Sequence, residues 1–105
     1  MATVSHHTYD YYEGGTAFAP GQTRSYCYGG PLGADPNGPW FDWFRKAVIA
    51  SAQPFDATGQ SRTLVVEEIR HRSIDAGKRY VCITIRNTGV SSTYIWYVTL
   101  GVISA

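Results

Sequence analysis

The fold is decided near the end of the chain, where residues 79–103 read RYVCITIRNTGVSSTYIWYVTLGVI. Within this stretch, Arg79–Arg86 alternates two sets of side chains, Val81, Ile83 and Ile85 against Tyr80, Cys82 and Thr84. A period of two is typical of a half-buried β-strand. Asn87-Thr88-Gly89 then favours a turn, and Thr93–Ile103 follows as a further strand.

The segment that precedes this stretch has the same character. Thr63–His71 is rich in Val and Ile. Asp75-Ala76-Gly77 supplies the next turn, because Gly77 tolerates a positive φ. The last third of the chain therefore predicts three successive antiparallel strands.

The first half of the chain gives a less uniform signal. Thr3–Tyr12 and Gln22–Tyr28 are predicted strands between turns rich in Gly and Pro. Trp40–Ala52 is ambiguous, because Pro39 and the apolar spacing fit a helix, whereas the aromatic run at 40–44 and the β-branched pair at 48–49 favour a strand. We predict a strand there and keep a helix as the alternative.

These segments predict one all-β domain over residues 1–105. Its length is that of a single domain, and no linker divides it. About six or seven short strands separated by turns indicate a small antiparallel β-sandwich. The alternative is a β-sandwich with one short helix at 39–52.

One short motif resembles a known family. Residues 80–89, YVCITIRNTG, are similar to the V-x-V-x-N-x-G strand and turn of bacterial immunoglobulin-like adhesion modules. The resemblance implies a β-sandwich and assigns no functional residue.

Charge and the start of the chain exclude some partners. Nine Lys and Arg balance eight Asp and Glu, which argues against nucleic acid. No run of apolar residues is long enough to form a membrane-spanning helix, and residues 1–20 do not resemble a signal peptide. We therefore expect a cytoplasmic or non-classically exported protein. Cys27 and Cys82 are then expected to be reduced strand residues, with a disulfide as the open alternative.

Motifs of covalent, phosphate or metal chemistry are absent from the sequence. The Gly-rich residues 29–33 lack the Lys-Ser/Thr ending of a P-loop. His6 and His7 are adjacent, so on a strand they point to opposite faces and do not share a metal ion. We expect no catalytic residue, no metal site and no cofactor.

The distinctive feature is aromatic, with three Trp and eight Tyr in one small domain. Several of these rings flank carboxylates. An aromatic ring stacks on the apolar face of a sugar while polar groups bind its hydroxyls, as binding sites combine apolar walls with a few polar groups. The sequence thus predicts a carbohydrate-binding, lectin-like module without catalytic activity, and the expected ligand-binding residues are Trp40, Trp43, Asp42, Tyr11, Tyr12 and Asp10.

Two other functions stay open. The aromatic residues suit a structural or protein-interaction subunit, in which Trp40, Phe44 and Trp96 fill the core and the tyrosines line its rim or an interface. Thr93–Ile103 is apolar on both faces, which favours a homo-oligomer. The third possibility is a small enzyme with an aromatic-lined pocket, in which Tyr hydroxyls, Asp10, Glu13 or Asp42 serve as acid or base on a hydrophobic substrate.

Overall fold

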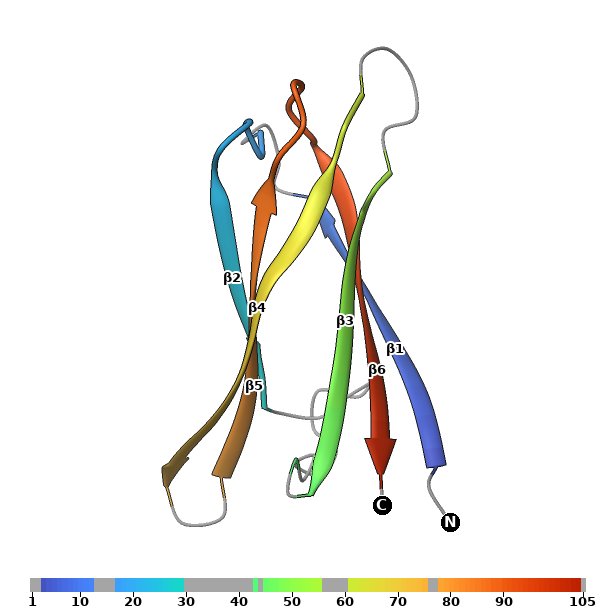
Figure 1. Cartoon of the computed structure of the whole chain (residues 1–105), viewed down its shortest axis with the longest axis vertical. Helices are drawn as coiled ribbons and strands as arrows, with labels where there is room; N and C mark the ends of the chain where they lie inside the picture. The colour runs from blue at the N-terminus through green and yellow to red at the C-terminus, as the bar shows by residue number, and fades with distance from the viewer. Residues whose placement is uncertain are drawn as a thin grey trace.

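The computed structural model contains six β-strands and describes residues 3–12, 17–29, 43, 45–55, 61–75 and 78–104 (Figure 1). The strands are, in chain order, β1 (Thr3–Tyr12), β2 (Thr23–Tyr28), β3 (Lys46–Pro54), β4 (Leu64–Asp75), β5 (Lys78–Asn87) and β6 (Ile95–Ser104). The described part of the chain is therefore all-β, as predicted. The ambiguous segment is a strand from Lys46 onward, and residues 39–42 lie outside the described ranges.

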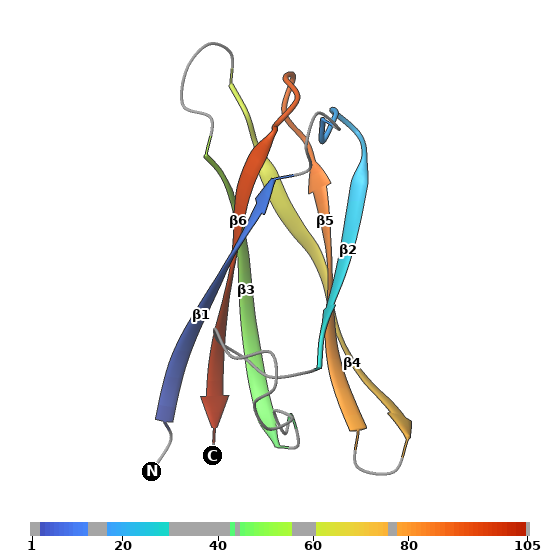
Figure 2. The same ribbon diagram turned by 180° about the vertical axis from the view of Figure 1, so that it is seen from behind.

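The strands form two antiparallel sheets of three strands each. Sheet I has the order β1-β6-β3, and sheet II has the order β2-β5-β4. The sheets face each other along the long axis of the molecule, as Figures 1 and 2 show from opposite sides. Every pair of neighbouring strands is antiparallel.

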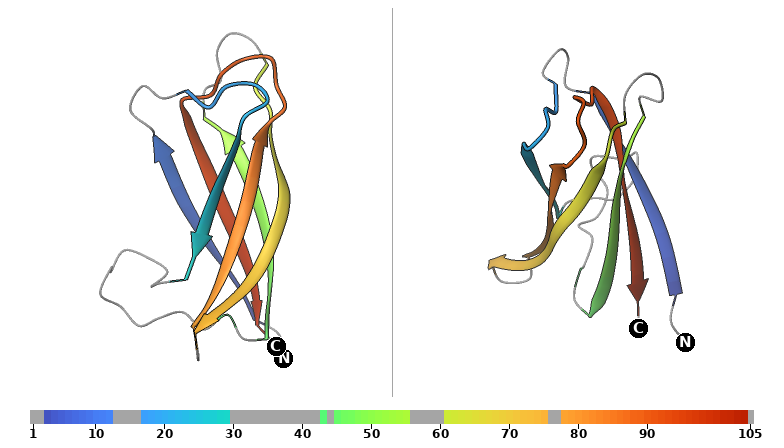
Figure 3. Two further views of the ribbon diagram at one scale, coloured as in Figure 1. Left: turned by 90° about the vertical axis from the view of Figure 1, so that its left-hand side faces the viewer. Right: turned by 45° about the horizontal axis from the view of Figure 1, so that its top comes forward.

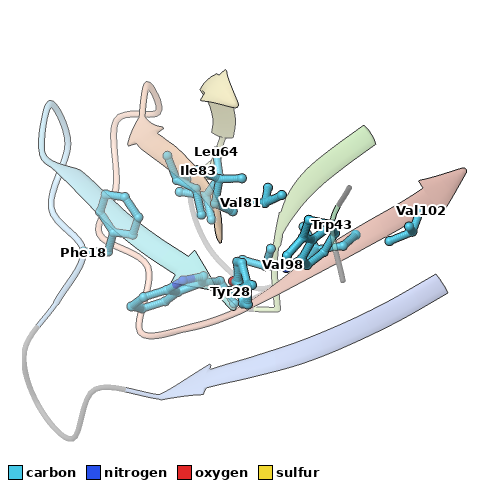
Figure 4. Packing of buried hydrophobic residues seen from close by; sticks show 11 residues of the cluster. Phe18, Tyr28, Trp43, Leu64, Val81, Ile83, Val98 and Val102 are labelled. Atoms are coloured by element: carbon cyan, nitrogen blue, oxygen red, sulfur yellow. The ribbon is translucent and has the colours of Figure 1, made fainter. Parts of the chain in front are cut away.

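Apolar side chains that alternate along the strands fill the space between the two sheets. On β6, Trp96, Val98, Leu100 and Val102 are buried, and the residues between them are partly exposed. Val81, Ile83 and Ile85 of β5, one of the two alternating sets, face them. Figure 4 shows this cluster with Phe18 and Trp43 beside it. The prediction that Trp96 fills the core is confirmed.

The prediction of three successive strands needs one correction. β4 and β5 form the expected hairpin, whereas β6 does not continue their sheet. It crosses to sheet I and pairs with β1 and β3. The physical reason is burial, because the apolar inner face of β6 and that of β5 cover each other only from opposite sheets.

The crossing from β5 to β6 is held by Asn87, which is fully buried. Its Nδ2 donates to the carbonyl oxygens of Phe18 at 2.7 Å and Ser91 at 3.0 Å, and its Oδ1 accepts from the Gly89 amide at 2.9 Å. The bridge between Phe18 and Thr93 lies beside it. The predicted turn residues Asn87 and Gly89 thus fix the connection between the sheets, whose course Figure 3 shows from the side and from above.

The expectation that the two cysteines are reduced also needs correction. Cys27 and Cys82 are directly opposite each other on β2 and β5 and form a disulfide, with Cα atoms 4.0 Å apart. The preference for reduced cysteines was wrong because it rested on the expected location of the protein and not on the pairing of the strands. The β2–β5 register places the two residues side by side on neighbouring strands.

Candidate functional site

Four tyrosines join the two sheets where the edge strands β1 and β2 face each other. The rings of Tyr11 and Tyr26 stack with their centroids 4.2 Å apart, and those of Tyr9 and Tyr28 lie 4.8 Å apart. The hydroxyls of Tyr11 and Tyr28 are 2.7 Å apart and share a hydrogen bond. These tyrosines therefore form a contact within the chain, which we call the tyrosine seam.

The tyrosine seam changes the acidity of three of its members, Tyr9, Tyr11 and Tyr28. Burial raises the pKa of Tyr28 far above its ordinary value, and the hydrogen bond that its hydroxyl donates to Tyr11 and the charges of the neighbouring phenols raise it further. Burial also raises the pKa of Tyr9 and of Tyr11. The seam is thus built to hold neutral phenols, since each charged form would lose its hydration there.

The structure separates the residues that the sequence assigned to a sugar site. Asp10 is exposed on the outer face of sheet I, whereas Tyr11 is half-buried in the tyrosine seam. Trp43 is 2% exposed, so its ring packs in the core and is covered in this conformation. Tyr12 ends β1, and Trp40 and Asp42 lie outside the described residues, so their assignment stays a prediction.

The exposed Asp10 has aromatic and polar neighbours on the outer face of sheet I. Directly opposite residues on paired strands present their side chains on one face. Asp10 pairs with Tyr97 on β6, and Gln53 on β3 pairs with Tyr97 from the other side. Phe55, which is 55% exposed, packs edge-on against Tyr97 with ring centroids 5.7 Å apart. A ring therefore lies between a carboxylate and an amide.

Directly opposite residues of β1, β6 and β3 form rows across this face, and the next two rows change from polar to apolar side chains. Thr8, Thr99 and Ser51 form a row of hydroxyls, in which the Oγ1 atoms of Thr8 and Thr99 are 3.1 Å apart. The following row has Gly101 between two side chains, those of His6 and Ile49. The missing side chain of Gly101 leaves a groove of about 320 Å³. Its volume is that of a site for one small ligand.

We call this surface the sheet I face and define it by the side chains of three rows together with Phe55. Its members are Asp10, Tyr97, Gln53, Thr8, Thr99, Ser51, His6, Gly101, Ile49 and Phe55. Only Asp10 of these belongs to the site predicted from sequence. The alternation in Thr93–Ile103 places Tyr97 on the face opposite to Trp96. The residues that lie beside Tyr97 on neighbouring strands could not be predicted, because they depend on the register between segments that are distant in sequence.

The described ranges contain neither a metal-binding cluster nor a membrane-spanning helix. No group of three or more His, Cys, Asp or Glu side chains is arranged there to hold a metal ion. Within the same residues, no helix has the length and apolar character needed to cross a membrane. Comparison with known proteins finds no matching family model, no similar curated protein and no similar solved structure.

Proposed function

We propose that the protein is a non-catalytic carbohydrate-binding module and that the sheet I face is its binding site. One observation carries the proposal, namely that Tyr97 lies between Asp10 and Gln53 on an exposed sheet face. The Tyr97 and Phe55 rings offer apolar surfaces to a pyranose ring. Asp10 accepts hydrogen bonds from sugar hydroxyls, and Gln53 both donates and accepts them.

The remaining rows extend the site along the strands. The hydroxyls of Thr8, Thr99 and Ser51 donate and accept hydrogen bonds, which suits the dense hydroxyl groups of a second sugar unit. The groove at Gly101 adds an apolar wall beyond them. The site therefore fits an oligosaccharide that runs along the strands better than a single monosaccharide.

Calorimetric titration across a panel of oligosaccharides tests the proposal. We expect saturable binding of at least one oligosaccharide, and a weaker response to its monosaccharide. Asp10→Ala removes an acceptor and should weaken binding at least about tenfold, since a lost hydrogen bond to a charged group is worth about 1.5–3 kcal/mol. Absence of binding across the panel by the folded wild type would overturn the proposal.

The topology supports a second, finer proposal about the fold. We infer that the domain is related to the immunoglobulin-like sandwich. The order β2-β5-β4 corresponds to the B-E-D order of that fold, and the β3–β6 pair corresponds to its C–F pair. Two features depart from it, because β1 occupies the place of the last strand and the disulfide joins strands of one sheet.

One observation favours the alternative of a protein-interaction subunit. Val4 and Ile49 are 60% and 63% exposed, and both line the groove on the sheet I face. Apolar side chains gathered at a groove are typical of surfaces that bind another molecule. Ile49→Ser would weaken a protein contact at the groove and leave the row of Asp10, Tyr97 and Gln53 unchanged.

A further inference from the structure

The described strands leave four sheet edges, at β1 and β3 of sheet I and at β2 and β4 of sheet II. An edge strand presents unpaired backbone donors and acceptors to any extended chain that approaches it. Proteins block such edges with short strands, bulges, charges or proline. The four edges differ in how many of these features they carry.

Three of the edges are protected. β4 has register shifts at Val66/Glu68 and at Ser73/Asp75, and charged residues follow the first shift. β2 has six residues and is tied to β5 by the disulfide. β3 begins with Lys46, ends with Pro54 and packs against β4.

The edge of β1 carries only one of these features, the exposed carboxylate of Asp10 near its end. Its ten residues pair with β6 without a register shift from Thr3 to Tyr12. Its sequence, TVSHHTYDYY, contains no proline and no Lys, Arg or Glu. Among the described strands, none pairs with its outer edge. β1 is therefore the edge best suited to accept another strand.

We propose that this edge binds a second copy of the chain, with the two β1 strands antiparallel across a two-fold axis at Thr8. A two-fold axis is the usual symmetry of a homodimer, and it makes each residue of β1 face a residue of the same strand in the other copy. Pairing β1 with β1 joins two copies of sheet I into one continuous sheet. The proposal is independent of carbohydrate binding.

Hydrogen-bond complementarity selects the register. Opposite residues of antiparallel strands share a face, so the outward-facing His6, Thr8 and Asp10 must pair with one another. With Thr8 on the axis, His6 lies opposite the partner's Asp10, and the symmetry produces this pair twice. A shift that centres His7 instead would place His7 against the partner's His7 and lose both His–Asp pairs. The first register is therefore preferred, because the imidazole N–H donates to a carboxylate.

The dimer would place the two sheet I faces on the same side of the joined sheet. Each copy keeps its own row of Asp10, Tyr97 and Gln53 close to the new strand pair. If the face binds an oligosaccharide, two sites on one side increase avidity for repeated ligands. Dimerisation itself is measured without any ligand, so its failure leaves the binding proposal to its own test.

Sedimentation equilibrium of the full chain from low to high micromolar concentration tests the dimer. The expected result is a reversible monomer–dimer equilibrium. Thr8→Lys places two like charges directly opposite each other on the axis, so dimer affinity should fall at least about tenfold. Ser51→Lys is the matched control, because Ser51 occupies the same row and face at the other edge of sheet I. It should leave dimer affinity unchanged.

Exchanging the two paired residues tests the register even if Thr8→Lys fails to fold. His6→Asp faces the partner's Asp10 with a second carboxylate and should weaken the dimer. Adding Asp10→His to that variant restores both pairs in reversed order and should recover the affinity. A wild type that stays monomeric, equal loss with Ser51→Lys, or no recovery in the exchanged variant would each overturn the proposal.

Discussion

The side chain of Asn87 ties the connection between β5 and β6 to the segment that precedes β2. It is fully buried and bonds to the Phe18 carbonyl, the Ser91 carbonyl and the Gly89 amide. Asn87→Ala leaves these backbone groups without their partners, so the free energy of unfolding should fall by about 3 kcal/mol. Denaturant unfolding followed by circular dichroism measures the change.

Asn87→Asp is a second variant that tests the same role of the Asn87 side chain. The carboxylate keeps an acceptor for the Gly89 amide but cannot donate to the two carbonyl oxygens. It should destabilise the fold by a similar amount, because it also buries a charge. If both variants unfold at the wild-type denaturant concentration, the structural role given to Asn87 is wrong.

The phenols of the tyrosine seam make stability depend on alkaline pH. The pKa of Tyr28 in the folded state is raised by burial above the unfolded value of about 10. Burial likewise raises the pKa of Tyr9 and of Tyr11. Raised values mean that the folded state retains protons that the unfolded state releases, so stability is present below pH about 10 and is lost as pH rises beyond it.

This predicts alkaline unfolding in which tyrosinate absorbance and loss of β-structure occur together. Tyr28→Phe removes one of the responsible phenols and the hydrogen bond to Tyr11. It should cost about 1 kcal/mol at neutral pH and make stability less sensitive to pH above about 10. Full tyrosine ionisation in a still-folded wild type would contradict the account of the seam.

Among the elements, strand positions followed from the sequence and strand pairing did not. Val81, Ile83 and Ile85 alternate clearly, and β1 has the same bounds as predicted, Thr3–Tyr12. Alternation reports only which residues share a face of one strand. It does not say that β6 leaves the hairpin to join β1, because that choice depends on the burial of two apolar faces against each other.

The disulfide is a covalent link between two strands, and the sequence did not predict it. It joins β2 to β5 across a sequence separation of 55 residues. In the chain-entropy model a loop of this length stabilises the fold by about 4 kcal/mol. Removing it with Cys27→Ala and Cys82→Ala together should lower the free energy of unfolding by about 2–4 kcal/mol.

Urea unfolding with and without a thiol reductant measures this contribution. The reductant should lower the midpoint of the wild type and leave that of the double alanine variant unchanged. An unchanged wild-type midpoint, with both thiols shown to be free by labelling, would contradict a stabilising role for the bond. The wild type in its oxidised form provides the reference for both comparisons.

At the scale of the whole molecule, the proposed site lies on one face of one sheet. Composition pointed to aromatic rings beside carboxylates, and Asp10 belongs to such a constellation. Its ring partner is Tyr97, which no local sequence pattern connects to Asp10. Trp43 was assigned to the site by its neighbours in sequence, but the fold uses its apolar area in the core. Local sequence thus pointed to a ring beside Asp10, but it did not identify Tyr97 as the ring that the strand register places there.

The most direct test of the binding proposal compares Tyr97→Ala with Tyr80→Ala in oligosaccharide titrations followed by calorimetry. Both variants remove a partly exposed tyrosine from the outward face of a sheet, but Tyr80 lies on sheet II. The proposal predicts that Tyr97→Ala abolishes measurable binding in a folded protein while Tyr80→Ala binds like the wild type. Equal affinity of the wild type and Tyr97→Ala would contradict it.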